Sequence, residues 1–195
     1  LLGGHTTEAS ELTVGFTVMG TLDGQPALLK SAANPGDSLI ITKAIGTGTL
    51  LAGIAQARTK GEWVDSLLAS MIKSNEAASI VAREAQANAV TDVTGFGLAG
   101  HLLEILDASE LNAEVRLSNL PLLPGAKQLL QEGLESTLAP ANRETAIRTK
   151  CAHESMTNSP EFAALFDPQT SGGLLLSISP EEEQRLHNQL NDAGV

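Results

Sequence analysis

The stretch TDVTGFGLAGH, residues 91–101, decides the fold that the rest of the chain has to fit. A short apolar run at residues 89–91 leads into it and predicts a strand, and the residues after it repeat leucine and isoleucine at helical spacing over 97–108. Gly95 and Gly97 mark the turn between the two, because glycine accepts positive φ and lets another backbone or a ligand come close. The segment therefore predicts a strand, a tight turn and a helix in direct succession.

The same segment carries groups that bind metal and phosphate. Asp92 offers a hard oxygen ligand of the kind that Mg²⁺ prefers and usually shares with substrate phosphates, and the free amides at the helix start attract phosphate oxygens. A plainer interpretation is that Asp92 or Thr94 only caps the helix, and the spacing alone favours it because glycine-rich helix starts are common. His101 has no second His, Cys or acid at metal-binding spacing, so we expect it to be structural.

Outward from this segment, the apolar pattern alternates between the periods of strands and helices. Strands are predicted at residues 11–20, 38–43, 89–91, 113–117 and 174–179, and helices at residues 49–57, 63–72, 74–87, 97–108, 126–132, 140–148 and 180–190. Residues 151–160 are expected to form a loop. The alternation predicts the α/β class, as an α+β sandwich in which helices cover a mixed sheet. A strand should follow the last helix, so we expect the domain to be truncated at its end.

Two further polar loops are candidate nucleotide contacts. DPQTSGG, residues 167–173, places hydroxyl and amide groups and paired glycines directly before a strand; it could face a polyphosphate, or Asp167 could simply bond the local backbone. GGHTT, residues 3–7, could form a nucleotide loop, although neither stretch has the Gly-Lys-Ser or Gly-Lys-Thr of the Walker pattern. Cys151 lies in a polar stretch without a strand-to-helix frame, so we do not assign it the role of a nucleophile.

Composition and charge restrict the possible partners. The chain has 195 residues, 42% of them hydrophobic but only 3% aromatic, which suits a packed domain whose core rests on aliphatic side chains. Its 23 acidic and 12 basic residues give a net charge of −11, so we expect neither nucleic acid nor an anionic membrane surface as a partner. A single cysteine excludes an internal disulfide, and we expect a cytoplasmic protein.

Five motifs occur in one order along the chain: GGHT, ITKAIGTG, TDVTGFGLAGH, LPLLPGA and FDPQTSGGLL. From Gly3 to the end, this series resembles the selenophosphate synthetases (selenide, water dikinases) of the aminoimidazole ribonucleotide synthetase-like superfamily. The resemblance implies that residues 1–21 end an N-terminal domain for ATP binding and dimerisation. Residues 22–195 would then be the C-terminal α/β domain.

The resemblance also implies a reaction and a set of site residues. Members make selenophosphate, AMP and phosphate from ATP, selenide and water, with Mg²⁺ bridging the polyphosphate, and the full-length protein is expected to be a homodimer. Asp92 matches the metal aspartate of the C-terminal domain. Gly95 and Gly97 match the turn after it. The nucleotide-side loop of the family matches Gly4, His5 and Thr6.

The chain also departs from the family's pattern. The catalytic Cys or selenocysteine and the catalytic Lys of the family lie upstream of the GGHT motif, so no catalytic residue is assigned in this segment. Ala44 stands where the family usually has proline. Two functions remain open on the sequence: part of an active dikinase whose isolated segment is inactive, or a non-catalytic nucleotide-binding or scaffold module of the same superfamily.

Overall fold

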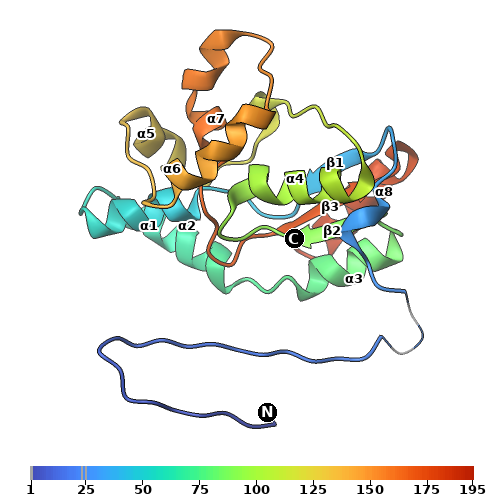
Figure 1. Cartoon of the computed structure of the whole chain (residues 1–195), viewed down its shortest axis with the longest axis horizontal. Helices are drawn as coiled ribbons and strands as arrows, with labels where there is room; N and C mark the ends of the chain where they lie inside the picture. The colour runs from blue at the N-terminus through green and yellow to red at the C-terminus, as the bar shows by residue number, and fades with distance from the viewer. Residues whose placement is uncertain (1, 23, 25) are drawn as a thin grey trace.

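The computed structural model describes residues 2–22, 24 and 26–195, and its centre is a three-stranded sheet (Figure 1). The strands are β1 (Ser38–Ile41), β2 (Ala89–Asp92) and β3 (Leu174–Ile178), in the order β1-β3-β2. Both outer strands run antiparallel to β3, with Ile40 and Val90 opposite Leu176. Because β1 and β2 point the same way, their carboxyl ends meet the start of β3 at one end of the sheet.

Helices cover both faces of this sheet. The α-helices are α1 (Thr47–Ala55), α2 (Gly61–Ile72), α3 (Glu76–Glu84), α4 (Gly97–Ser109), α5 (Ala126–Gln131), α6 (Ala139–Asn142), α7 (Pro160–Ala164) and α8 (Pro180–Asp192). Short 3-10 helices are η1 (Lys30–Ala32), η2 (Leu117–Asn119), η3 (Arg143–Arg148) and η4 (Glu154–Asn158). None of the helices within the described part of the chain has the length and hydrophobicity that crossing a membrane requires.

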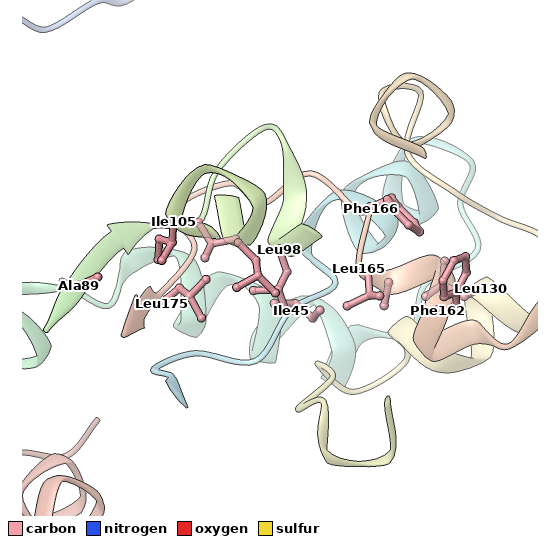
Figure 2. Close-up of a cluster of buried hydrophobic side chains, with 12 residues drawn as sticks. Ile45, Ala89, Leu98, Ile105, Leu130, Phe162, Leu165, Phe166 and Leu175 are labelled. Carbon is pink, nitrogen blue, oxygen red and sulfur yellow. The ribbon is translucent and has the colours of Figure 1, made fainter. Parts of the chain in front are cut away.

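Strand β3 divides the core because its side chains alternate between the two faces. Leu176 and Ile178 pack with α3 and α8 in one cluster, whereas Leu175 packs with Leu98 and Ile105 of α4 in another. The second cluster continues away from the sheet to Leu130, Phe162, Leu165 and Phe166 (Figure 2). A third cluster joins α1, α2 and α5. The continuous apolar run of β3 therefore reflects burial on both faces.

The predicted α/β class is confirmed. The expected mixed sheet is antiparallel in its three named strands, and among the described residues the parallel pairing is confined to an isolated bridge between Ile45 and Leu122. The predicted strand at residues 113–117 does not form, and that segment runs as a loop into η2. The predicted loop at residues 151–160 contains η4 and leads into α7, which the sequence analysis missed because its apolar pattern spans only five residues.

Residues 11–20, which alternate like a strand, are extended but pair with no strand among the described residues. They lie in a segment, residues 2–22, that runs apart from the packed body (Figure 1). The apolar side chains of Leu12, Val14, Phe16 and Val18 remain exposed. An alternating segment gains stability only from a neighbouring edge and a covered face, and residues 2–22, 24 and 26–195 supply neither to it.

We expect deletion of residues 1–20 to change the free energy of unfolding by less than about 0.5 kcal/mol, because residues 2–20 bury no side chain in the body. Urea denaturation of the two forms makes the comparison. The deletion should also lower self-association in light scattering, since unpaired apolar strands associate. Val14→Lys in the whole chain is the matched variant and should have the same effect on association. A loss of more than about 1 kcal/mol on deletion would show that the segment packs on the body.

Candidate functional site

Three of the sequence motifs meet at the end of the sheet where β1 and β2 finish and β3 begins. The Val93 amide donates to the Gly173 carbonyl (2.9 Å) and the Gln169 amide to the Thr94 carbonyl (2.9 Å). A Cβ added to Gly172 would lie 2.1 Å from the Val93 carbonyl oxygen. One added to Gly173 would lie 2.6 Å from the Lys43 amide nitrogen. The paired glycines are therefore needed because three backbone segments touch there.

The GFG turn splits into a packed glycine and an open one. Gly97 has a φ of +70°, and a Cβ on it would lie 2.9 Å from the Leu165 carbonyl oxygen. At Gly95 nothing lies within 4 Å of an added Cβ. The Asn142 side-chain amide donates to the Gly95 carbonyl (2.8 Å) and the Phe166 carbonyl (3.0 Å), which ties the turn to the next loop. Packing alone accounts for Gly97, whereas Gly95 leaves its surface accessible to a ligand.

The polar residues of the DPQT stretch cap helix α1. Gly48 N–H (3.1 Å) and the Thr49 hydroxyl (2.7 Å) donate to the Asp167 carboxylate. The Gln169 side-chain carbonyl accepts from Gly46 N–H (3.0 Å) and Thr47 N–H (3.3 Å), and its amide group donates to Asp167 Oδ2 (2.9 Å). The first turn of α1 thus obtains acceptors for its free N–H groups from a distant loop. These two side chains face the protein rather than a polyphosphate.

Burial governs the protonation of Asp167, which is 1% exposed. Desolvation raises the pKa of its carboxyl group to about 6, and the hydrogen bonds from Thr49, Gln169 and Gly48 act in the opposite direction. The helix start of α1 also favours a negative charge at this position. Asp167 is therefore a structural carboxyl group that is ionised only above a pH of about 6.

Asp92 differs from Asp167 in its exposure and in its hydrogen-bond partners. It ends the edge strand β2, it is exposed, and no hydrogen bond or ion pair reaches its carboxylate from residues 2–22, 24 or 26–195. Thr170 and Ser171, also exposed, follow the DPQ stretch in the loop before β3, and Ser171 has a φ of +53°. Asp92, Gly95 and the two hydroxyl residues are therefore exposed polar positions of these motifs that a ligand can reach.

Lys43 holds the loop before β3 through its buried ammonium group, a role that the sequence did not predict. Its ammonium group donates to the carbonyls of Ser70 (3.2 Å), Lys73 (2.6 Å) and Ser171 (3.0 Å), and the side chain is buried. Desolvation and the nearby Lys73 lower the pKa of Lys43. A lysine directly after an apolar run, as in LIITK, is the signal that could have identified it, because a buried cation needs several partners.

The other residues discussed in the sequence analysis lie in the core, in the exposed N-terminal segment or in a loop. His101 is buried, 5% exposed, and both ring nitrogens have partners, as expected for a structural histidine. Gly4, His5 and Thr6 lie in the exposed segment apart from the body, so the chain by itself does not bring them to Asp92. Their assignment as nucleotide contacts stays a prediction. Cys151 is half-buried in a loop and belongs to no cluster of metal-binding side chains among the described residues.

The fold and the motif-bearing end of the sheet define the class of this protein. Residues 34–195 match the family described as "AIR synthase related protein, C-terminal domain", and the chain belongs to that family. Two solved structures share the fold over most of the chain. One is a thiamine-monophosphate kinase from Stenotrophomonas maltophilia K279a (TM-score 0.59, 20% identity, 87% of this chain and 48% of that one). The other is the hydrogenase maturation protein HypE (TM-score 0.56, 18% identity, 86% and 43%).

Curated relatives narrow the resemblance further, to proteins named "Selenide, water dikinase". The one from Clostridioides difficile (strain 630) is 35% identical over 100% of this chain and 56% of its own length. The one from Caldanaerobacter subterraneus subsp. tengcongensis is 37% identical over 98% of this chain and 55% of its own length. The chain thus spans about half the length of the curated relatives it matches.

Gly172→Ala should destabilise the fold by about 2–3 kcal/mol, because the new methyl group would overlap the Val93 carbonyl oxygen and force the two loops apart. Urea denaturation measures the change. Gly61→Ala is the matched control, since an added Cβ there meets nothing within 4 Å at the start of α2. Equal stability of the two variants would contradict the close contact of the loops.

The stability contributed by Asp167 should fall as the pH rises from about 4 to about 7. Its folded pKa of about 6 lies above the unfolded value of 3.8, so the folded state holds a proton that the unfolded state releases. This contribution is fully present below pH 3.8 and is lost as the pH passes 6. The quantity to compare is the free energy of unfolding of the native protein minus that of Asp167→Asn. It should be about 1 kcal/mol larger at pH 5 than at pH 7.5. The exposed Asp65→Asn is the control, and a difference independent of pH would contradict the assignment.

Proposed function

We propose that this chain is the C-terminal part of an ATP-dependent selenide, water dikinase that makes selenophosphate, AMP and phosphate from ATP, selenide and water. The sequence similarity to proteins of that name, over almost the whole chain, supports the proposal. The observation that carries it is the exposed carboxylate of Asp92, which has no partner among the described residues and lies where the family motifs converge. The alternative is a non-catalytic nucleotide-binding or scaffold module of the same superfamily, and only an assay of the full-length protein separates the two.

In this proposal Asp92 holds a Mg²⁺ ion against the nucleotide phosphates. Mg²⁺ in nucleotide sites keeps several waters and takes only one or two carboxylates together with phosphate oxygens. The donor set fits such a shared site, because Asp92 is a hard, accessible oxygen ligand. It does not fit a complete protein cage, since no group of three metal-binding side chains occurs in the described part of the chain. The metal would neutralise phosphate charge beside a chain whose net charge is −11.

The remaining groups at this end of the sheet would position the nucleotide. Gly95 leaves its backbone accessible, and Thr170 and Ser171 present exposed hydroxyls that can donate to phosphate oxygens. Gly97 is part of the same turn and shapes it. Gly4, His5 and Thr6 would reach the nucleotide from the preceding domain.

The domain boundary and the assembly are parts of the same proposal. Residues 1–21 would end the N-terminal ATP-binding and dimerisation domain, and 22–195 would form the C-terminal domain. The exposed extended segment at residues 2–22 supports a boundary there. The full-length protein would act as a cytoplasmic homodimer. The nucleophilic Cys or selenocysteine and the catalytic Lys would come from the preceding domain.

In the full-length protein, Asp92→Asn should lower the formation of AMP from ATP with selenide by at least about 100-fold, because the amide removes the charge that holds the metal. Nucleotide analysis of the reaction products measures this. Asp65→Asn, on the exposed surface of α2, is the matched control and should leave the rate unchanged. If the unaltered full-length protein makes no AMP, the non-catalytic alternative holds instead.

The chain alone should bind ATP weakly or not detectably by calorimetry in the presence of Mg²⁺. One aspartate makes a poor metal site, and phosphoryl transfer relies on several groups acting together. Micromolar affinity of residues 1–195 for ATP would show that the described surface is sufficient by itself.

A further inference from the structure

Two side chains hold consecutive carbonyl groups of the loop before β3. The Lys43 ammonium donates to the Ser171 carbonyl (3.0 Å), and the Asn75 side-chain amide donates to the Gly172 carbonyl (2.9 Å). The other two protons of the ammonium group go to carbonyls at the C-terminal end of α2. Lys43 therefore has no proton left for a ligand, and its contribution to the site can only be made through the loop.

Ser171 depends on these bonds because its backbone is strained. Its φ of +53° lies in the left-handed region, which is unfavourable for a residue with a side chain. Such a conformation persists only where the surrounding structure fixes it. The carbonyls that Lys43 and Asn75 hold are those of this residue and of the next one. The two donors therefore set the direction in which the exposed Ser171 side chain leaves the loop.

Asn75 does not stabilise its own helix through its side chain. It precedes α3 at the N-cap position but makes no capping bond, and the Ser74 hydroxyl accepts from the Glu76 N–H instead (3.0 Å). The Asn75 side-chain oxygen is buried and has no hydrogen-bond partner among the described residues, which is unfavourable for the folded state. Turning the amide over would not help, because the oxygen would then face the Gly172 carbonyl.

The strand register places the Asp92 side chain on the side of the sheet that α3 covers. Asp92 lies opposite Leu174, and residues directly opposite each other in an antiparallel pair share a face. Leu174 packs in the cluster that joins β3 to α3 and α8. Asn75 stands at the start of the same α3. The residue that holds the loop and the candidate metal ligand therefore belong to one face of the sheet, at the end where β2 finishes.

We propose that Asn75 and Lys43 are positioning residues, which hold the loop of residues 170–172 in the conformation that binds the nucleotide phosphates. The proposal rests on the proposed function, which supplies the phosphate contacts of Thr170 and Ser171. Asn75 and Lys43 do not touch the ligand themselves. Asn75 leaves its own oxygen without a partner while its amide fixes the Gly172 carbonyl, so its effect on the site should separate from its effect on stability.

Steady-state kinetics of AMP formation by the full-length protein, with the ATP concentration varied, tests this separation. Asn75→Ala should raise the KM for ATP roughly tenfold and leave kcat within about twofold, because a loosened loop loses phosphate binding that substrate and transition state share. Its urea midpoint should stay close to the native one, since the variant leaves one carbonyl without a partner but removes another. The matched control is Ser74→Ala, which removes the cap of α3 and should lower the urea midpoint with KM unchanged.

The outcomes distinguish this proposal from the proposed function. If the unaltered full-length protein makes AMP but Asn75→Ala has the native KM for ATP, the positioning role is wrong and the proposed function stands. Equal effects of Asn75→Ala and Ser74→Ala on KM would overturn the positioning role in the same way. Absence of AMP formation by the unaltered protein would overturn both.

Hydrogen exchange on the chain of residues 1–195 tests the loop without any need for activity. The Thr170 amide, which donates to the Thr47 hydroxyl (2.8 Å), reports on the order of the loop. Asn75→Ala should speed its exchange roughly tenfold, whereas the Ala87 amide, just after α3, should exchange as in the native chain. Lys43→Met should speed exchange at Thr170 as well, and Lys43→Arg should do so less. Native exchange at Thr170 in Asn75→Ala would overturn the proposal.

Discussion

The structure depends on a buried carboxylate and a buried amide that cap a helix from a distant loop. Asp167 and Gln169 supply the acceptors for the first turn of α1, and the same loop donates the Gln169 amide to the Thr94 carbonyl. The start of α1 and the turn before α4 are thus held by one short piece of chain. Because the three strand ends meet at this place, the shape of the candidate site follows from a few polar contacts in the core.

Much of the fold follows from the sequence because strands β1, β2 and β3 and the longer helices each carry a periodic apolar pattern. The segments where prediction failed lack either length or a partner. Helix α7 is too short to show a period, and residues 11–20 have a clear period but no neighbouring edge in the part of the chain that the structure describes. The antiparallel direction of β1 and β2 relative to β3 could not be predicted either, since strand direction depends on long-range pairing that periodicity does not encode.

The candidate site was predicted in part. Asp92 and Gly95 are exposed as a ligand site requires, and His101 is structural as expected. The sequence could not distinguish the two halves of DPQTSGG: Asp167 and Gln169 are buried caps, whereas Thr170 and Ser171 are exposed. Lys43 was missed because its three carbonyl partners come from α2, its C-terminal cap and the loop before β3, segments far from it in sequence.

The capping of α1 also shapes how this domain folds. Helix α1 follows β1 almost directly in the sequence, yet the carboxylate that accepts from Gly48 lies 119 residues further along. A nine-residue helix is marginal without tertiary support, so α1 becomes stable only after a long loop has closed, which is entropically costly. Strand β3 must pair with β1 and β2 in the same step, since it lies between them in the sheet. Folding is therefore dominated by non-local contacts and is expected to be slow. Helix α1 and strand β1, near the start of the domain, become stable only when the C-terminal part of the chain has packed against them.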